Sequence, residues 1–115
     1  MAEPTYVPTP YSYSSAVVAG EYVFLGLHRG FGEDFRAQLG DVFANLQQTL
    51  GSLEMPLSSI VQVRVWLKEI GDLPEMEKLF ANYFEQGRFP ARMTATTRFI
   101  DDDCLVMVEG IAWRG

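Results

Sequence analysis

An arginine within residues 89–94 is the side chain best suited to do chemistry in this sequence. The segment reads FPARMT, so Arg92 comes directly after a proline turn and begins a strand-like run that is otherwise short of charge. A guanidinium stays ionised at cellular pH and can hold a carboxylate by two parallel hydrogen bonds. Arg92 is therefore a candidate anion-binding residue, and the alternative is an ordinary ion pair with one of the 15 acidic residues.

The other reactive residue types lack the partners that chemistry would need. His28 is the only histidine and has no cysteine neighbour, so we predict no metal site and no Ser-His-Asp triad. Cys104 follows three aspartates, whose negative field is expected to raise its thiol pKa and make it less reactive. Residues 101–103 have the wrong spacing for a calcium loop and indicate a solvated turn. We expect no cofactor.

Composition indicates a compact globular protein. The chain has 115 residues, of which 48% are hydrophobic and 13% aromatic, and we predict one domain over residues 1–115. Its formal net charge is −6, and its nine basic residues are scattered. Phosphate affinity needs clustered Lys and Arg, so the charge argues against nucleic acid as a partner.

The expected setting is reducing and cytoplasmic. A single cysteine cannot form an intramolecular disulfide, and no N-terminal segment has the pattern of a signal peptide. The longest apolar run falls far short of the roughly 20 residues that span a bilayer, so we predict no membrane partner.

Periodicity predicts an alternating order of strands and helices. Residues 1–10 carry three prolines and indicate an extended arm, followed by paired strands at 15–19 and 22–27. A helix is expected from an N-cap at Asp34 to a stop at Gly51, and a second from a cap at Asp72 to a stop at Gly87. Three more strands are expected, at 60–67, 92–100 and 104–113, with Val61, Val63 and Val65 sharing one face of the first.

The order β-β-α-β-α-β-β predicts an α+β sandwich with two helices on one face of a mixed sheet. The strands at 60–67 and 92–100 are joined through a helix, so they need a crossover connection and should be parallel or separated by one strand. The face away from the helices would carry Trp66 and the threonines of TATT rather than Lys and Glu. Such a face needs a cover, and we predict oligomerisation through it.

Four stretches carry a family resemblance: PYS at 10–12, VFLG at 23–26, FPARMT at 89–94 and VMVEGIAW at 106–113. In this order and length they resemble the reactive-intermediate deaminase (Rid, YjgF-like) family, also called L-PSP endoribonuclease-like, over nearly the whole chain from Pro10 onward. The resemblance implies a chorismate-mutase-like fold that assembles as a homotrimer with clefts between subunits.

The resemblance also implies a site and a reaction. Arg92 would bind the carboxylate of a small 2-imino or enamine acid, which is hydrolysed to the 2-keto acid and ammonia. By the same resemblance the cleft would be lined by Tyr11, Leu25, Gly26, Phe80, Met93, Thr94 and Met107. Simple packing is an equal alternative for Tyr11.

This chain departs from the family pattern at several of these positions. Met107 stands where active members have a glutamate that holds the attacking water, and a thioether cannot act as a base. Glu109, two residues further along the same strand face, is either a substitute catalytic carboxylate or a structural one. Glu77 stands where an asparagine is frequent, Leu25 where a serine is common, and Thr94 where a cysteine is common.

Three functions follow as hypotheses. The first is a trimer that binds small carboxylates with Arg92 and hydrolyses imines or enamines, with Arg92 and Glu109 as catalytic residues. The second is the same trimer as a non-catalytic metabolite-binding module, which the loss at Met107 favours. The third is another reaction on a bulkier substrate, because Phe80 and Met107 would make the cleft less polar.

Overall fold

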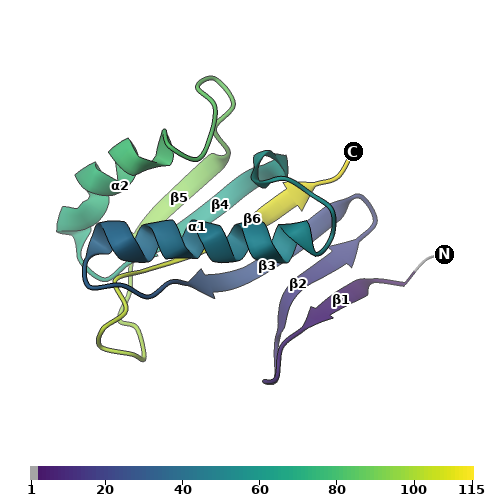
Figure 1. The fold of residues 1–115 in the computed structure, drawn as a ribbon, viewed down its shortest axis with the longest axis horizontal. Coiled ribbons are helices and arrows are strands. Elements are labelled where there is room, and N and C mark those ends of the chain that lie inside the picture. The colour runs from purple at the N-terminus through teal and green to yellow at the C-terminus, as the bar shows by residue number, and fades with distance from the viewer. Residues whose placement is uncertain (1–2) are drawn as a thin grey trace.

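Six strands form one mixed sheet in the computed structural model, which describes residues 3–115 (Figure 1). Their order across the sheet is β1-β2-β3-β6-β4-β5. Only β4 and β5 pair in parallel, and the other neighbours are antiparallel. The strand bounds are β1 (Thr5–Pro8), β2 (Ser14–Ala19), β3 (Tyr22–Arg29), β4 (Ile60–Leu67), β5 (Ala91–Thr96) and β6 (Val106–Trp113).

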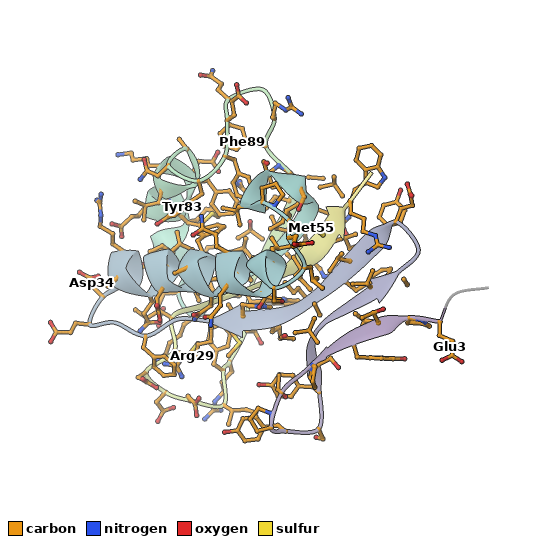
Figure 2. All side chains as sticks on the ribbon, turned by 45° about the vertical axis from the view of Figure 1, so that its right-hand side comes forward. Glu3, Arg29, Asp34, Met55, Tyr83 and Phe89 are labelled. Carbon is orange, nitrogen blue, oxygen red and sulfur yellow. The ribbon has the colours of Figure 1, made fainter. Side chains whose placement is uncertain are left out.

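Two helices pack on one face of this sheet (Figure 1). Helix α1 (Phe35–Gly51) lies across its middle, and α2 (Leu73–Phe80) lies beside the edge strand β5. The Asp34 side chain caps α1 as predicted, because it accepts a hydrogen bond of 2.8 Å from the backbone N–H of Ala37 (Figure 2). A short 3-10 turn at Leu57–Ser59 precedes β4, and another at Ile70–Asp72 precedes α2.

The predicted α+β order is confirmed, and one further strand precedes it. Residues 5–8 of the predicted arm are not a free extended segment, because they pair antiparallel with β2 as strand β1. The first two residues of the predicted arm lie outside the described part of the chain. The expected parallel pairing of β4 with β5 is also confirmed.

The ends of several elements differ from the prediction, among them that of β3, which continues to Arg29 instead of stopping at residue 27. Helix α2 stops at Phe80, because the next residues turn through tighter i→i−3 hydrogen bonds, from Asn82 to Leu79 and from Tyr83 to Phe80. Strand β5 stops at Thr96 rather than at residue 100, and β6 begins at Val106 rather than at residue 104.

A bulge in β4 overturns the predicted position of Val61. Val63 and Val65 are buried under the helices, but Val61 is 43% exposed. The pairing of β4 with β6 shifts register between Ile60 and Gln62, so one extra residue enters the strand and Val61 leaves the buried face.

The hydrophobic core lies between the sheet and the two helices. Phe43 of α1 is completely buried, and its ring stacks on Tyr83 at 4.2 Å between centroids. The rings of Phe80 and Phe84 meet Phe43 edge-on at 5.4 and 5.7 Å. This aromatic cluster fixes α2 against α1 and so sets the position of α2 beside β5.

The opposite side of the sheet, here called the open face, has no helix over it in the described chain. It carries large apolar side chains that are about half exposed, among them Tyr22, Phe24 and Trp113. A shallow hollow of about 440 Å³ lies on this face and is lined by Tyr22, Phe24, Val61, Gln62, Ala91 and Ile111. Apolar patches of this kind mark interaction surfaces in monomeric folds.

Within residues 3–115, no helix has both the length and the apolar sequence needed to cross a membrane.

Candidate functional site

Arg92 lies at the start of the edge strand β5, on the face that the helices cover. It pairs with Val63 of β4, which is 1% exposed and points into the core. Side chains of paired residues point to the same side of a sheet, so the Arg92 side chain leaves the strand toward α2. The turn that ends in Pro90 delivers the arginine to this position, as the sequence predicted.

Two residues of α2 contact the Arg92 guanidinium. Its Cζ atom lies 5.3 Å from the ring centre of Phe80, and its Nη2 donates a hydrogen bond of 2.5 Å to the Glu77 carboxylate. The Arg92 side chain is 28% exposed and that of Glu77 is 61% exposed. Arg92 is therefore half sheltered by an aromatic ring, and Glu77 lies on its solvent side.

Most of the donors of Arg92 are unused. A guanidinium has five N–H groups in a planar fork, and within residues 3–115 only Nη2 of Arg92 has a hydrogen-bond partner. Because β5 is an edge strand, its outer side also presents backbone groups that no described strand pairs. The fork and the strand edge together can accept a carboxylate from solvent.

Thr94 adds an unsatisfied hydroxyl to the same face of β5. Its Oγ1 atom is buried, and no group in the described chain bonds to it. Buried hydroxyls nearly always have a partner in protein or water, so this oxygen is an unsatisfied group close to Arg92. Thr94 follows Arg92 by two residues, which is about 7 Å along a strand.

Glu109 is held by two donors on the open face. Its Oε1 accepts a hydrogen bond of 2.7 Å from Arg64, and its Oε2 accepts one of 2.9 Å from the indole N–H of Trp66. Burial disfavours the charged form, but the two hydrogen bonds outweigh it and lower the pKa of Glu109. A carboxylate with both oxygens engaged and a lowered pKa is a weak base. Of the two roles considered for Glu109, the geometry favours the structural one.

Arg92 and Glu109 lie on opposite faces of the sheet. Arg92 points toward the helices, whereas Glu109 pairs with Arg64 on the open face, and β4 separates their strands. One chain therefore cannot direct both side chains at one small ligand. A site that used both residues would have to combine two chains.

The predicted lining residues are spread over the sheet. Leu25 is 4% exposed and Phe80 is 2% exposed, so both belong to the core rather than to an open cleft in this chain; only the Phe80 ring reaches Arg92. Gly26 lies at a bulge between β3 and β6. Tyr11 is 75% exposed in the turn between β1 and β2, where its ring stacks on Tyr13, at the other end of the sheet from β5.

The two methionines of the predicted site face the open side. Met93 pairs with Arg64, and Met107 pairs with Trp66 of β4 and with Arg29 of β3. Met93 is 41% exposed, and Met107 is half-buried. The structure therefore separates Met93 and Met107 from Arg92 within one chain, although Met93 follows Arg92 directly.

An ion-pair cluster that the sequence analysis missed ties the acidic turn to β3. Arg29 donates to Asp101 at 2.9 Å and to Asp103 at 2.8 Å, and its Cζ lies 4.3 Å from the ring centre of Phe31. The hydrogen bond from Arg29 lowers the pKa of Asp103. The sequence gives no local signal for this cluster, because Arg29 lies more than 70 residues before the aspartates that it binds.

The thiol pKa of Cys104 is raised, as predicted, but mainly for another reason. Its side chain is completely buried, and burial is the largest cause of its raised pKa; the nearby aspartates add to the effect. It lies just before β6, not within a strand.

His28 bridges β3 and α1 as a neutral ring. Its Nδ1 lies 2.6 Å from the carbonyl oxygen of Gly26 and must donate, so Nε2, 2.8 Å from Thr49 Oγ1, accepts from the hydroxyl. Burial lowers the pKa of His28, and the hydrogen bond to Gly26 opposes this only in part. No group of three or more His, Cys, Asp or Glu side chains suited to a metal occurs in residues 3–115.

Protonation of His28 should therefore weaken the fold. The unfolded chain binds a proton near pH 6.5 and the folded chain only at lower pH, so stability is full above about pH 6.5 and falls as pH drops below it. The limiting slope for one proton is about 1.4 kcal/mol per pH unit. We expect urea unfolding of the His28→Gln variant to depend less on pH between 7.5 and 5.5 than that of the wild type. Equal pH dependence in the two proteins would contradict this assignment.

Comparison with known proteins gives a consistent result. The family model described as "Endoribonuclease L-PSP" matches residues 5–114. A RutC family protein from Pyrococcus horikoshii is 28% identical, over 89% of this chain and 86% of the relative.

Solved structures share the fold. A member of the YjgF protein family from Neisseria meningitidis superposes with a TM-score of 0.92 at 25% identity, covering 98% of this chain and 96% of the other. RidA from an Antarctic Psychrobacter has a TM-score of 0.84 at 23% identity, covering 94% and 93%, which supports the fold alone.

Proposed function

Because the chain belongs to the L-PSP endoribonuclease family, also called the Rid or YjgF family, we propose that it binds small carboxylates through Arg92 in clefts between subunits. The proposed reaction is hydrolysis of 2-imino or enamine acids to 2-keto acids and ammonia. The observation that carries the proposal is a guanidinium at a sheet edge, backed by Phe80, with most of its donors unused among the described residues.

Assembly of the chain into a homotrimer is part of this proposal. The open face exposes Tyr22, Phe24 and Trp113, and burying such a face against another copy would be favourable at roughly 25 cal/mol per Å². The positions of Arg92 and Tyr11 at opposite ends of the sheet support the same conclusion. If both line one cleft, as the family resemblance implies, then two chains must contribute to it.

In the proposed reaction the residues of the chain mainly orient the substrate. Arg92 holds the carboxylate, a water oxygen attacks the neighbouring iminium carbon, and the nitrogen leaves as ammonia, so that imine and water give keto acid and ammonia. Met107 cannot accept a proton, and Glu109 is a weak base. Solvent therefore carries the protons, and we expect slow catalysis.

A non-catalytic carboxylate-binding trimer is the second candidate. Met107 favours it, because the position that holds the attacking water in active relatives has no oxygen here. The two candidates share the Arg92 site and differ only in whether bound imine is hydrolysed faster than free imine.

The test is hydrolysis of 2-iminopropanoate and 2-iminobutanoate, generated in situ by an amino-acid oxidase. We expect the wild type to accelerate hydrolysis and Arg92→Ala to lose at least tenfold, because a charged hydrogen-bond pair is worth about 1.5–3 kcal/mol. Arg92→Lys keeps the charge but not the fork and should fall between them. Light scattering after size exclusion checks that each variant keeps the assembly of the wild type.

The outcomes separate the candidates. Arg92-dependent acceleration supports the deaminase. Arg92-dependent binding of pyruvate without acceleration identifies the binding module. If neither binding nor hydrolysis depends on Arg92, the carboxylate site is wrong.

A further inference from the structure

Glu77 places a negative charge on the group that is proposed to bind the ligand. Its carboxylate accepts a 2.5 Å hydrogen bond from Nη2 of Arg92, and the two residues belong to different elements, α2 and β5. A carboxylate beside the ligand site repels an anionic ligand. The structure shows that this carboxylate does face Arg92.

The pair is open to solvent mainly on the side of Glu77. The Glu77 side chain is 61% exposed, whereas the Arg92 side chain is 28% exposed and has the Phe80 ring on one side. A ligand that approaches Arg92 from solvent therefore comes next to the Glu77 carboxylate. Within the described residues only Nη2 of Arg92 has a partner, and each terminal nitrogen of a guanidinium carries two N–H groups. Nη2 can therefore keep Glu77 with one N–H, while its other N–H and that of a neighbouring nitrogen form a fork for a second carboxylate.

We propose that Glu77 is a specificity residue that selects ligands with a cationic nitrogen next to the carboxylate. The ligand carboxylate binds the free side of the Arg92 fork, and its ammonium or iminium group pairs with Glu77. A plain carboxylate must share Arg92 with Glu77 and is repelled by it. This inference rests on the proposed role of Arg92 and narrows its substrate class to dipolar acids, such as a protonated 2-imino acid.

Two stable ring compounds of the same shape test this selection. L-Proline and cyclopentanecarboxylate both carry a carboxylate on a five-membered ring, but only proline has a cationic nitrogen beside it. Two unit charges about 4 Å apart in a water-like medium change affinity by roughly fivefold. We expect the wild type to bind proline about fivefold more tightly than cyclopentanecarboxylate in isothermal titration calorimetry.

The Glu77→Gln variant removes the charge but keeps the size of the side chain and an oxygen for Arg92. We expect it to bind cyclopentanecarboxylate about fivefold more tightly and proline with about unchanged affinity, because loss of the ammonium contact offsets relief of the carboxylate repulsion, so the preference disappears. Glu75→Gln is the matched control, because it makes the same charge change on α2 and has no hydrogen bond or ion pair to Arg92. It should leave the ratio of the two affinities unchanged.

The result distinguishes failure of this inference from failure of the proposed function. Arg92→Ala should abolish binding of both ring compounds. If both bind through Arg92 but their affinity ratio is the same in wild type and Glu77→Gln, the selection by Glu77 is wrong and the carboxylate site stands. If the ratio changes equally in Glu75→Gln, the effect comes from the overall negative charge of α2 and not from the contact between Glu77 and the ligand, and the inference fails. If neither compound binds in an Arg92-dependent way, the carboxylate site fails and the inference with it.

Discussion

Replacing Gly110 with alanine should destabilise the protein by about 3 kcal/mol, the upper range for overpacking a core. Gly110 lies in the centre of the sheet, between Leu25 of β3 and Val63 of β4. A Cβ atom at this position would lie 2.2 Å from the carbonyl oxygen of Gln62 and 3.3 Å from the Cα of Val63. Both are backbone atoms of the bulged strand β4, so no side-chain rotation can relieve the contact.

Urea unfolding followed by circular dichroism measures this effect. Gly51→Ala is the control, because a Cβ at Gly51 would meet nothing within 4 Å at the end of α1. The control should unfold within about 1 kcal/mol of the wild type, since alanine is a better helix former than glycine by that amount. An unchanged midpoint for Gly110→Ala would mean that the β4 bulge moves freely, against the register described for it.

Replacing Met107 with glutamate should raise imine hydrolysis by about 100-fold, the lower range for a positioned general base. This prediction rests on the proposed deaminase site, where the corresponding carboxylate of active relatives holds the attacking water. Met107 pairs with Arg29 on the neighbouring strand, but the Arg29 guanidinium is already bound by Asp101 and Asp103 and supplies little further positive charge. Glu109, two residues away, is already paired with Arg64, which limits repulsion between the two acids.

The assay compares kcat/KM of Met107→Glu with that of Met107→Gln. Glutamine has a side chain of the same size as glutamate and a carbonyl oxygen, but no charge. Only the glutamate variant should gain, and its gain should disappear when Arg92→Ala is added. No gain in a variant that still assembles and binds pyruvate would show that position 107 does not face the bound substrate.

Local sequence patterns predicted the elements of the fold well, because their causes are local. Asp34 caps α1 through a residue three positions away, and burial alternates along β4 from Val63 onward. The bulge at Val61 could not be predicted, because it forms where β4 meets Ile111 and Ala112 of β6, about 50 residues later in the chain.

The candidate site was predicted only in part for the same reason. Arg92 was identifiable because its turn and its strand adjoin it in sequence. Its contact with Glu77 depends on how α2 lies against β5, which is decided by the aromatic cluster around Phe43 rather than by any motif. To predict that Arg92 and Glu109 lie on opposite faces, one must also know the strand order. The sequence alone does not place β4 between β5 and β6.

The alternation along β6 has a consequence for how this protein can evolve. Every second residue points under the helices, where a change is felt as lost stability, and the residues between them point to the open face. Substitutions on the open face leave the core intact, but they change the surface that is proposed to meet another copy of the chain. Substitutions at Val106, Val108, Gly110 and Ala112 are therefore expected to act on folding, and those at Met107, Glu109, Ile111 and Trp113 on assembly and binding.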